Sequence, residues 1–242
     1  APEDCRRWHA EAIRPETILL VVAGDFDPEA WKDRIAGLTA DWPVAARSRP
    51  RQESSPQNQR QPLTEMTRPA LQQGFVIVGF ATPPVTHADY PALRLASAAL
   101  GEGFGGRIFA NLRDRKSLAY ACGAALHSYR LGGHQTLHIG TKPQTIGEGR
   151  DGLLEEANYL KTNLLGDEEL NRAREFAIGK HLMGRQSFAQ RVAGLAWWED
   201  HAGDAALDAR WPDRLREVTA GQILEAARRW WNEPTVVILR PE

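Results

Sequence analysis

The chain has 242 residues, of which 42% are hydrophobic and 25% are charged, a composition typical of a globular protein that can bury a core. Its formal net charge of −1 argues against an electrostatic nucleic-acid binder and against a protein that coats a membrane surface. No segment approaches the roughly 18 to 20 consecutive apolar residues of a membrane-spanning helix, so we expect no membrane insertion.

The first part of the chain predicts a helix, a strand and a second helix. The first helix is expected over residues 3–13, and the β-rich run at residues 18–23 predicts a buried strand. Asp27 followed by Pro28 predicts a helix start, and this helix should end near Leu38. These elements are too few for a domain, so something else must cover the strand. The first residues show no initiator Met and no signal-peptide pattern, which indicates a processed end or a fragment boundary.

Residues 43–70 differ from the rest of the chain in composition. Prolines at positions 43, 50, 56, 62 and 69 are mixed with Arg, Gln, Ser and Asn, and large apolar residues are rare. This pattern is typical of an extended linker, and we expect a domain boundary inside it.

After the linker, the apolar residues predict strands and then a group of helices. Strands are expected at residues 75–80, 118–126, 136–140 and 236–239, and the short connection between the second and third predicts an antiparallel pair. Helices are expected at residues 90–100, 108–114, 145–163, 168–183 with Asp167 as its cap, and 187–200, and a last helix starts at Thr219 with a capping box to Gln222. This order predicts an α+β fold in which an antiparallel sheet packs on helices.

The segment from Gly101 to Gly106 matches the G-x-G-x-x-G pattern of dinucleotide-binding proteins. That function requires a strand before the pattern and a long helix after it. Here a helix precedes it, and Glu102 places a carboxylate where a phosphate would bind. We therefore interpret the segment as a flexible loop that ends a helix.

Candidate metal ligands and nucleophiles are few. A zinc site of a peptidase needs three ligands, and neither His-x-x-Glu-His nor Cys-x-x-Cys occurs. His134 and His138 could share one face of a strand, but no third ligand is close in sequence. Cys122 lies in an apolar strand, where a cysteine is usually structural, and a G-x-S-x-G nucleophile elbow is absent. The sequence predicts no metal site and no cofactor in this chain.

Arg113 and Tyr120 are the remaining candidates for chemistry. Arg113 ends a predicted helix, and Tyr120 lies at the start of the next strand. Taken alone, they fit a surface arginine and a half-buried tyrosine. Presented side by side, however, their side chains could donate hydrogen bonds to a peptide carbonyl and its developing oxyanion.

Four segments together resemble the pitrilysin-like (insulinase-type) zinc metallopeptidases. Residues 9–27 end in Val-Val-Ala-Gly-Asp-Phe-Asp, similar to the "VVxGDxD" of that family, and residues 73–79 resemble the first strand of its second domain. Residues 100–109 resemble "LGxGxxSRLF", with Gly105-Gly106 in place of the usual small-Ser pair, and residues 112–120 resemble "LRxxxGLAY".

The resemblance implies one half of a clamshell-shaped peptidase, of the mitochondrial processing peptidase type. Residues 1–42 would be the last part of a first α+β domain, and residues 71–242 would be the second domain. In two-subunit members of the family one chain carries zinc and the other supplies an Arg/Tyr pair. The resemblance therefore implies a zinc-free partner that encloses an unfolded peptide and assists catalysis with Arg113 and Tyr120.

The same resemblance implies further partners and sites. Zinc is expected in a homologous partner subunit, making a heterodimer, or in a domain upstream. A substrate-contact role is implied for Gly101, Gly103, Gly105, Gly106 and Arg107. Bacterial two-subunit relatives are often exported, which favours a periplasmic protein. Two alternatives stay open: the C-terminal part of a complete zinc peptidase, and a purely structural protein such as the core subunits of cytochrome bc complexes.

Overall fold

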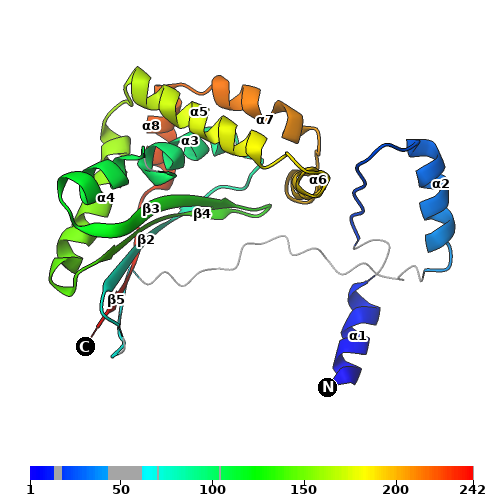
Figure 1. The fold of residues 1–242 in the computed structure, drawn as a ribbon, viewed down its shortest axis with the longest axis horizontal. Helices are drawn as coiled ribbons and strands as arrows, with labels where there is room; N and C mark the ends of the chain where they lie inside the picture. Colours follow the sequence, from blue (N-terminus) through cyan, green and yellow to red (C-terminus); the bar gives the residue numbers. More distant parts are fainter. Residues whose placement is uncertain (14–17, 43–61, 70, 104, 242) are drawn as a thin grey trace.

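A five-stranded sheet organises the larger part of this protein, whose computed structural model describes residues 1–13, 18–42, 62–69, 71–103 and 105–241 (Figure 1). The strands lie in the order β1-β5-β2-β4-β3, with β1 parallel to β5 and the other neighbours antiparallel. Their bounds are β1 Leu63–Thr67, β2 Gly74–Thr82, β3 Ala119–Ser128, β4 Gly133–Thr141 and β5 Thr235–Arg240.

The helices of this part gather on one side of the sheet (Figure 1). They are α3 Tyr90–Gly101, the π-helix η2 Phe109–Arg115, the 3₁₀ turn η3 Pro143–Thr145, α4 Ile146–Thr162, α5 Asp167–Met183, α6 Phe188–Ala202, α7 Leu207–Arg216 and α8 Ala220–Trp230. The α+β class and a mostly antiparallel sheet packed on helices are therefore confirmed, whereas the parallel pair of β1 and β5 was not predicted. Among the described residues, no helix is both long enough and apolar enough to span a membrane.

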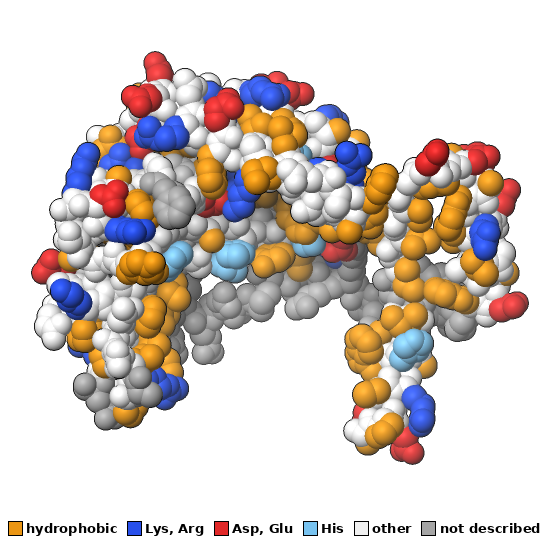
Figure 2. All heavy atoms as spheres, in the orientation of Figure 1, with side chains coloured by type: hydrophobic (Ala, Val, Ile, Leu, Met, Phe, Trp, Pro, Cys, Tyr) orange, Lys and Arg blue, Asp and Glu red, His pale blue; other side chains and the backbone are white. Residues whose placement is uncertain are grey.

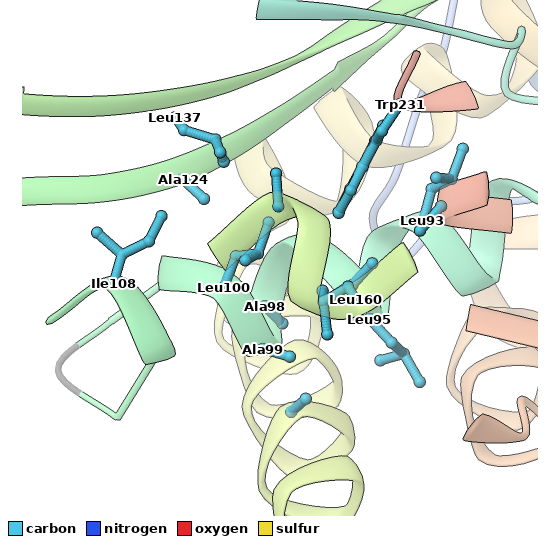
Figure 3. Close-up of a cluster of buried hydrophobic side chains, with 14 of the residues drawn as sticks. Leu93, Leu95, Ala98, Ala99, Leu100, Ile108, Ala124, Leu137, Leu160 and Trp231 are labelled. Atoms are coloured by element: carbon cyan, nitrogen blue, oxygen red, sulfur yellow. The ribbon is translucent and has the colours of Figure 1, made fainter. Parts of the chain in front are cut away.

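The core lies between the sheet and this helical layer. In β2 every second residue is buried, because one face of the strand points into the core and the other points away from it. Figure 3 shows Leu100 from a helix near Leu137 from the sheet, and Leu93 near Trp231, with Leu160 in the same cluster. All five side chains are at most 1% exposed, so the contact between the two layers excludes water.

The predicted ends of several helices can be checked against their caps. Thr219 accepts a hydrogen bond from the backbone of Gln222 and completes the predicted capping box of α8. Asp167 is not the cap of α5: Gly166 occupies that position and Asp167 is the first helical residue. An acid there still favours the helix dipole. Helix α7 was not predicted from the sequence. Its interior Pro212 is unfavourable in a helix, but the buried Trp211 anchors it in the structure.

The start of the sheet differs from the predicted linker. Residues 43–61 of that linker lie outside the described residues, whereas residues 63–67 form β1, which pairs with β5. The short run between Pro62 and Pro69 is long enough for an edge strand. The folded part therefore begins before the predicted position 71.

Two helices precede the linker, α1 Pro2–Ala12 and α2 Pro28–Thr39, and the Asp27 side chain caps α2 as predicted. The predicted buried strand at residues 18–23 is wrong in this structure: the segment is not a strand, and Leu19 and Leu20 are 46% and 58% exposed. A buried strand needs a neighbour for its backbone groups, and the described residues provide none there.

Candidate functional site

Arg113 and Tyr120 lie side by side, the arrangement that a shared role at a peptide carbonyl would require. Arg113 is on η2, and its guanidinium carbon lies 4.3 Å from the ring centre of Phe109 and 5.3 Å from that of Tyr120. Both distances are within the range of cation–π contacts. The Tyr120 side chain is 83% exposed, so its phenol is presented to solvent rather than packed in the sheet.

The backbone between these residues explains why they meet. Ser117 has a positive φ of 53°, and Leu118 donates a 2.8 Å backbone hydrogen bond to the carbonyl of Leu112, which reverses the chain. The pairing of β3 with β4 then shifts register between Ala119 and Ala121, which places Tyr120 at an irregularity of the strand. Such bulges redirect side chains, so the turn and the bulge together bring Tyr120 back to Arg113.

Phe109 is the member of this group that the sequence analysis missed. It lies four residues before Arg113, a spacing that places two side chains on one face of a helix, so the contact could have been predicted from the sequence. Contacts with two aromatic rings restrict the motion of the guanidinium while leaving its N–H groups available as donors. The arrangement can therefore present a fixed cation and a phenol hydroxyl to a carbonyl oxygen.

Arg107 is engaged in ion pairs within the protein. Its Nε donates to Glu156 at 2.7 Å, its Nη1 lies 3.3 Å from Glu169, and its guanidinium carbon lies 3.5 Å from the ring centre of Tyr159. Burial opposes the charge of Arg107, but the two carboxylates outweigh it and raise the pKa of the guanidinium. Arg107 thus fastens the start of η2 to α4 and α5, and a structural role accounts for its contacts.

Several glycines of the predicted loop are required by the packing of the backbone. A Cβ on Gly106 would lie 2.5 Å from Cα of Gly101, and a Cβ on Gly101 would lie 2.8 Å from the backbone nitrogen of Ala124. Only glycine allows these close approaches. Gly103 adopts a φ of +103°, which other residues rarely adopt. Gly103 and Gly105 are exposed, whereas Gly101 and Gly106 are buried.

Glu102 anchors this loop from within. Its carboxylate pairs with Arg94, accepts a hydrogen bond from Ser97 Oγ at 2.8 Å and pairs with Lys180 Nζ at 3.0 Å. Burial would raise the pKa of Glu102, but the two cations hold it below its ordinary value. The carboxylate that argued against a phosphate site is therefore part of a buried ionic cluster.

The histidines do not form a metal centre. Within the described ranges, no group of three or more His, Cys, Asp and Glu side chains could hold a metal ion. His127 and His134 stack with ring centres 4.8 Å apart, and burial lowers the pKa of both His134 and His138. Burial also raises the pKa of the Cys122 thiol, which disfavours the reactive thiolate.

Known proteins resemble the chain in sequence and in fold. The family model of the peptidase M16 inactive domain matches residues 1–176. An uncharacterized zinc protease of Mycobacterium leprae is 25% identical over 231 residues, which cover 93% of this chain and 51% of that protein. The chain spans about half the length of the curated relatives that it matches.

Solved structures share the fold over the whole chain. A protease from Helicobacter pylori superimposes with a TM-score of 0.86 at 17% identity, covering 100% of this chain and 59% of that chain. A peptidase M16 inactive domain from Pseudomonas fluorescens gives a TM-score of 0.81 at 20% identity, covering 100% of this chain and 58% of that chain. At these identities the likeness shows the fold alone.

Proposed function

Because the chain belongs to the inactive-domain family of the M16 peptidases, the pitrilysin-like zinc proteases, we propose that it is the zinc-free half of a zinc endopeptidase. In this proposal it helps to enclose an extended peptide, and it presents Arg113 and Tyr120 to an active site whose zinc is held by a homologous half. That half is either a separate subunit or a domain upstream in the same chain.

The observation that carries this proposal is the exposed pair of Arg113 and Tyr120. The chain folds back through a positive-φ residue and a strand irregularity to bring the two side chains together. An exposed phenol held beside a guanidinium contributes little to a core, so stability alone does not account for the arrangement. Both groups are hydrogen-bond donors, which suits a carbonyl oxygen that gains negative charge.

In the proposed reaction the Tyr120 hydroxyl donates a hydrogen bond to the carbonyl oxygen of the scissile peptide bond. The charge that develops on that oxygen strengthens this bond, so the interaction favours the transition state over the bound substrate. Arg113, which contacts the rings of Phe109 and Tyr120, keeps the phenol in place and adds a positive field. In this proposal the other half supplies the zinc and its chemistry; among the described residues no group of three or more His, Cys, Asp and Glu side chains could hold a metal ion.

Within the glycine loop, we propose a substrate-contact role only for Gly103 and Gly105. These two residues are exposed, whereas the packing of Gly101 and Gly106 explains why glycine stands there. The ion pairs of Arg107 likewise explain its presence without substrate. The periplasmic location and the peptide substrate stay predictions from the family resemblance.

The test is peptide hydrolysis by the assembled protease, zinc-bearing half included. Replacing Tyr120 with Phe should reduce turnover by about 10²-fold, the effect of removing one oxyanion donor. Tyr129→Phe is the matched control, because Tyr129 is also exposed but lies between β3 and β4, and it should leave turnover unchanged. Equal turnover of wild type and Tyr120→Phe would refute the catalytic role and favour a purely structural subunit.

A second candidate is the C-terminal part of a complete zinc peptidase, which is favoured by the half-length coverage of the curated relatives. Zinc content and intact mass of the protein from its own cells separate the two arrangements. About one zinc per chain, with a mass near that of the longer relatives, indicates a single chain. A zinc-free protein that co-purifies with a zinc-bearing chain indicates two subunits.

A further inference from the structure

The face of the sheet that points away from the helices carries no charged side chain. Residues directly opposite each other in the pairing share a face, so Ile77, His138 and Gly123 form one row across β2, β4 and β3. The next row contains Phe75, Gly140 and Ala121. On this helix-free face the described strand positions hold only apolar residues, glycine, threonine and histidine.

Large apolar side chains on this face are exposed and contiguous. Met66, Phe75 and Ile77 are 42%, 40% and 44% exposed. Leu239 on β5 lies opposite both Phe75 and Met66, and Val237 lies opposite Ile77. We name these five residues the apolar floor. Figure 2 shows hydrophobic and histidine side chains gathered in the hollow below the helical layer.

A sheet face that meets only water normally carries polar and charged residues. A contiguous exposed apolar face instead marks a surface that binds something. The strands themselves do carry charged residues: Glu65 on β1 and Arg240 on β5 form an ion pair at 3.1 Å. Both alternate with the floor residues along β1 and β5, and so point to the opposite side of the sheet.

Two glycines shape the surface next to the floor. The position of a Cβ on Gly140 lies 3.2 Å from the Phe75 ring, and that of a Cβ on Gly123 lies 3.2 Å from the His138 ring. The two rings therefore lie down against the backbone of the neighbouring strand. A larger side chain at either glycine would displace the ring beside it and obstruct an approaching chain; at Gly123 it would also lie 3.0 Å from the Gly101 carbonyl oxygen.

We propose that the apolar floor binds an extended, uncharged segment of the peptide substrate through its large apolar side chains. This inference rests on the proposed function and names the class of segment that the chain accepts. The floor is continuous with the candidate site, because Ala121, in the same row as Phe75, directly follows Tyr120. A segment that enters along the floor therefore leads to the phenol. A charged segment would lose its hydration there without gaining a partner.

The test uses the whole 242-residue chain and two fluorescent peptides of equal length. In the first peptide Leu and Phe alternate with Ser. In the second, Glu and Lys replace the Leu and Phe residues. Binding is measured by fluorescence anisotropy for wild type, Ile77→Lys and Ile77→Thr. Leu182→Lys and Leu182→Thr are the controls, since Leu182 is 56% exposed but lies on α5 in the helical layer. Thermal unfolding of each variant verifies that it is folded.

We expect wild type to prefer the uncharged peptide. Ile77→Lys should weaken that binding by roughly tenfold and Ile77→Thr by about threefold, the effect of part of one apolar contact, and the Leu182 variants should bind like wild type. Equal binding of both peptides, or equal losses in the Ile77 and Leu182 variants, would overturn the inference. The proposed function is tested separately by the turnover of Tyr120→Phe. If the Ile77 variants lose binding but Tyr120→Phe keeps full turnover, the proposed function has failed. If Tyr120→Phe loses turnover but the Ile77 variants bind like wild type, the inference about the apolar floor has failed.

Discussion

Val76 and Val78 on strand β2 are fully buried beneath the helices, whereas Phe75 and Ile77 on the same strand are 40% and 44% exposed on the other side. The buried face must fill the space between sheet and helices, so packing determines its residues. No packing constraint applies to the exposed face, yet it lacks the charged residues that a solvent-exposed surface usually carries. Packing therefore explains the residues on one side of this sheet, and binding is the better explanation for those on the other side.

The largest difference between the faces should be in stability. Leu137 on β4 is fully buried on the helix-covered side, so Leu137→Ala should lower the free energy of unfolding by about 2 to 5 kcal/mol. Ile77→Ala removes a side chain that is already half exposed and should cost less than about 1.5 kcal/mol. Urea denaturation measures both values. Similar losses would mean that the exposed face is also packed.

Buried charge in the helical layer should have the next largest effect. Glu102→Gln leaves Arg94 and Lys180 without a carboxylate and should cost about 2 kcal/mol at pH 7. The pKa of Glu102 is lower in the folded than in the unfolded chain, so its contribution is present above its ordinary pKa of 4.5 and is lost as pH falls below that value. Denaturation curves of wild type and variant should therefore converge in acid. A constant difference at all pH values would contradict this assignment.

Adding a methyl group should lower stability more in the core than on the exposed face of the sheet. A Cβ on Gly152 of α4 would lie 2.6 Å from the buried Leu112 side chain, so Gly152→Ala should cost about 1 to 3 kcal/mol through overpacking. A Cβ on Gly140 would lie 3.2 Å from the Phe75 ring, which can swing toward solvent, and 3.7 Å from the Ala121 carbonyl oxygen, an ordinary contact. Gly140→Ala should therefore change stability by less than about 1 kcal/mol. Calorimetry compares the two melting temperatures, and a larger loss at Gly140 would reverse the comparison.

The smallest expected effect is on the exposed face near neutral pH. Burial lowers the pKa of His138, so the folded protein favours the neutral ring. This preference adds stability above the ordinary pKa of 6.5 and is lost as pH falls toward the folded pKa. His138→Gln should remove a dependence of less than about 1 kcal/mol between pH 7 and 5. NMR titration of the ring checks the direction, and a raised pKa would contradict it.

Local patterns in the sequence predicted most elements of the folded part, because these depend on residues close in the chain. The pairing of Arg113 with Tyr120 was implied by the family resemblance, since the residues alone fit a surface arginine and a half-buried tyrosine. The contacts of Arg107 could not be predicted in this way, since Glu156 and Glu169 lie 49 and 62 residues later and only the fold brings them near. The buried strand predicted at residues 18–23 is wrong because composition indicates what can form a strand, not whether a neighbouring strand exists.

The position of β5 also has a consequence for how the protein folds as it is made. This strand lies between β1 and β2 in the sheet, yet all the helices of the folded part separate it from β2 in the chain. A ribosome therefore releases β1 and β2 long before the strand that joins them. Until residues 235–240 emerge, β1 has no partner and one edge of β2 stays open, which exposes the nascent chain to aggregation. Such late, long-range closure is slow, so we expect chaperones to hold this intermediate during translation.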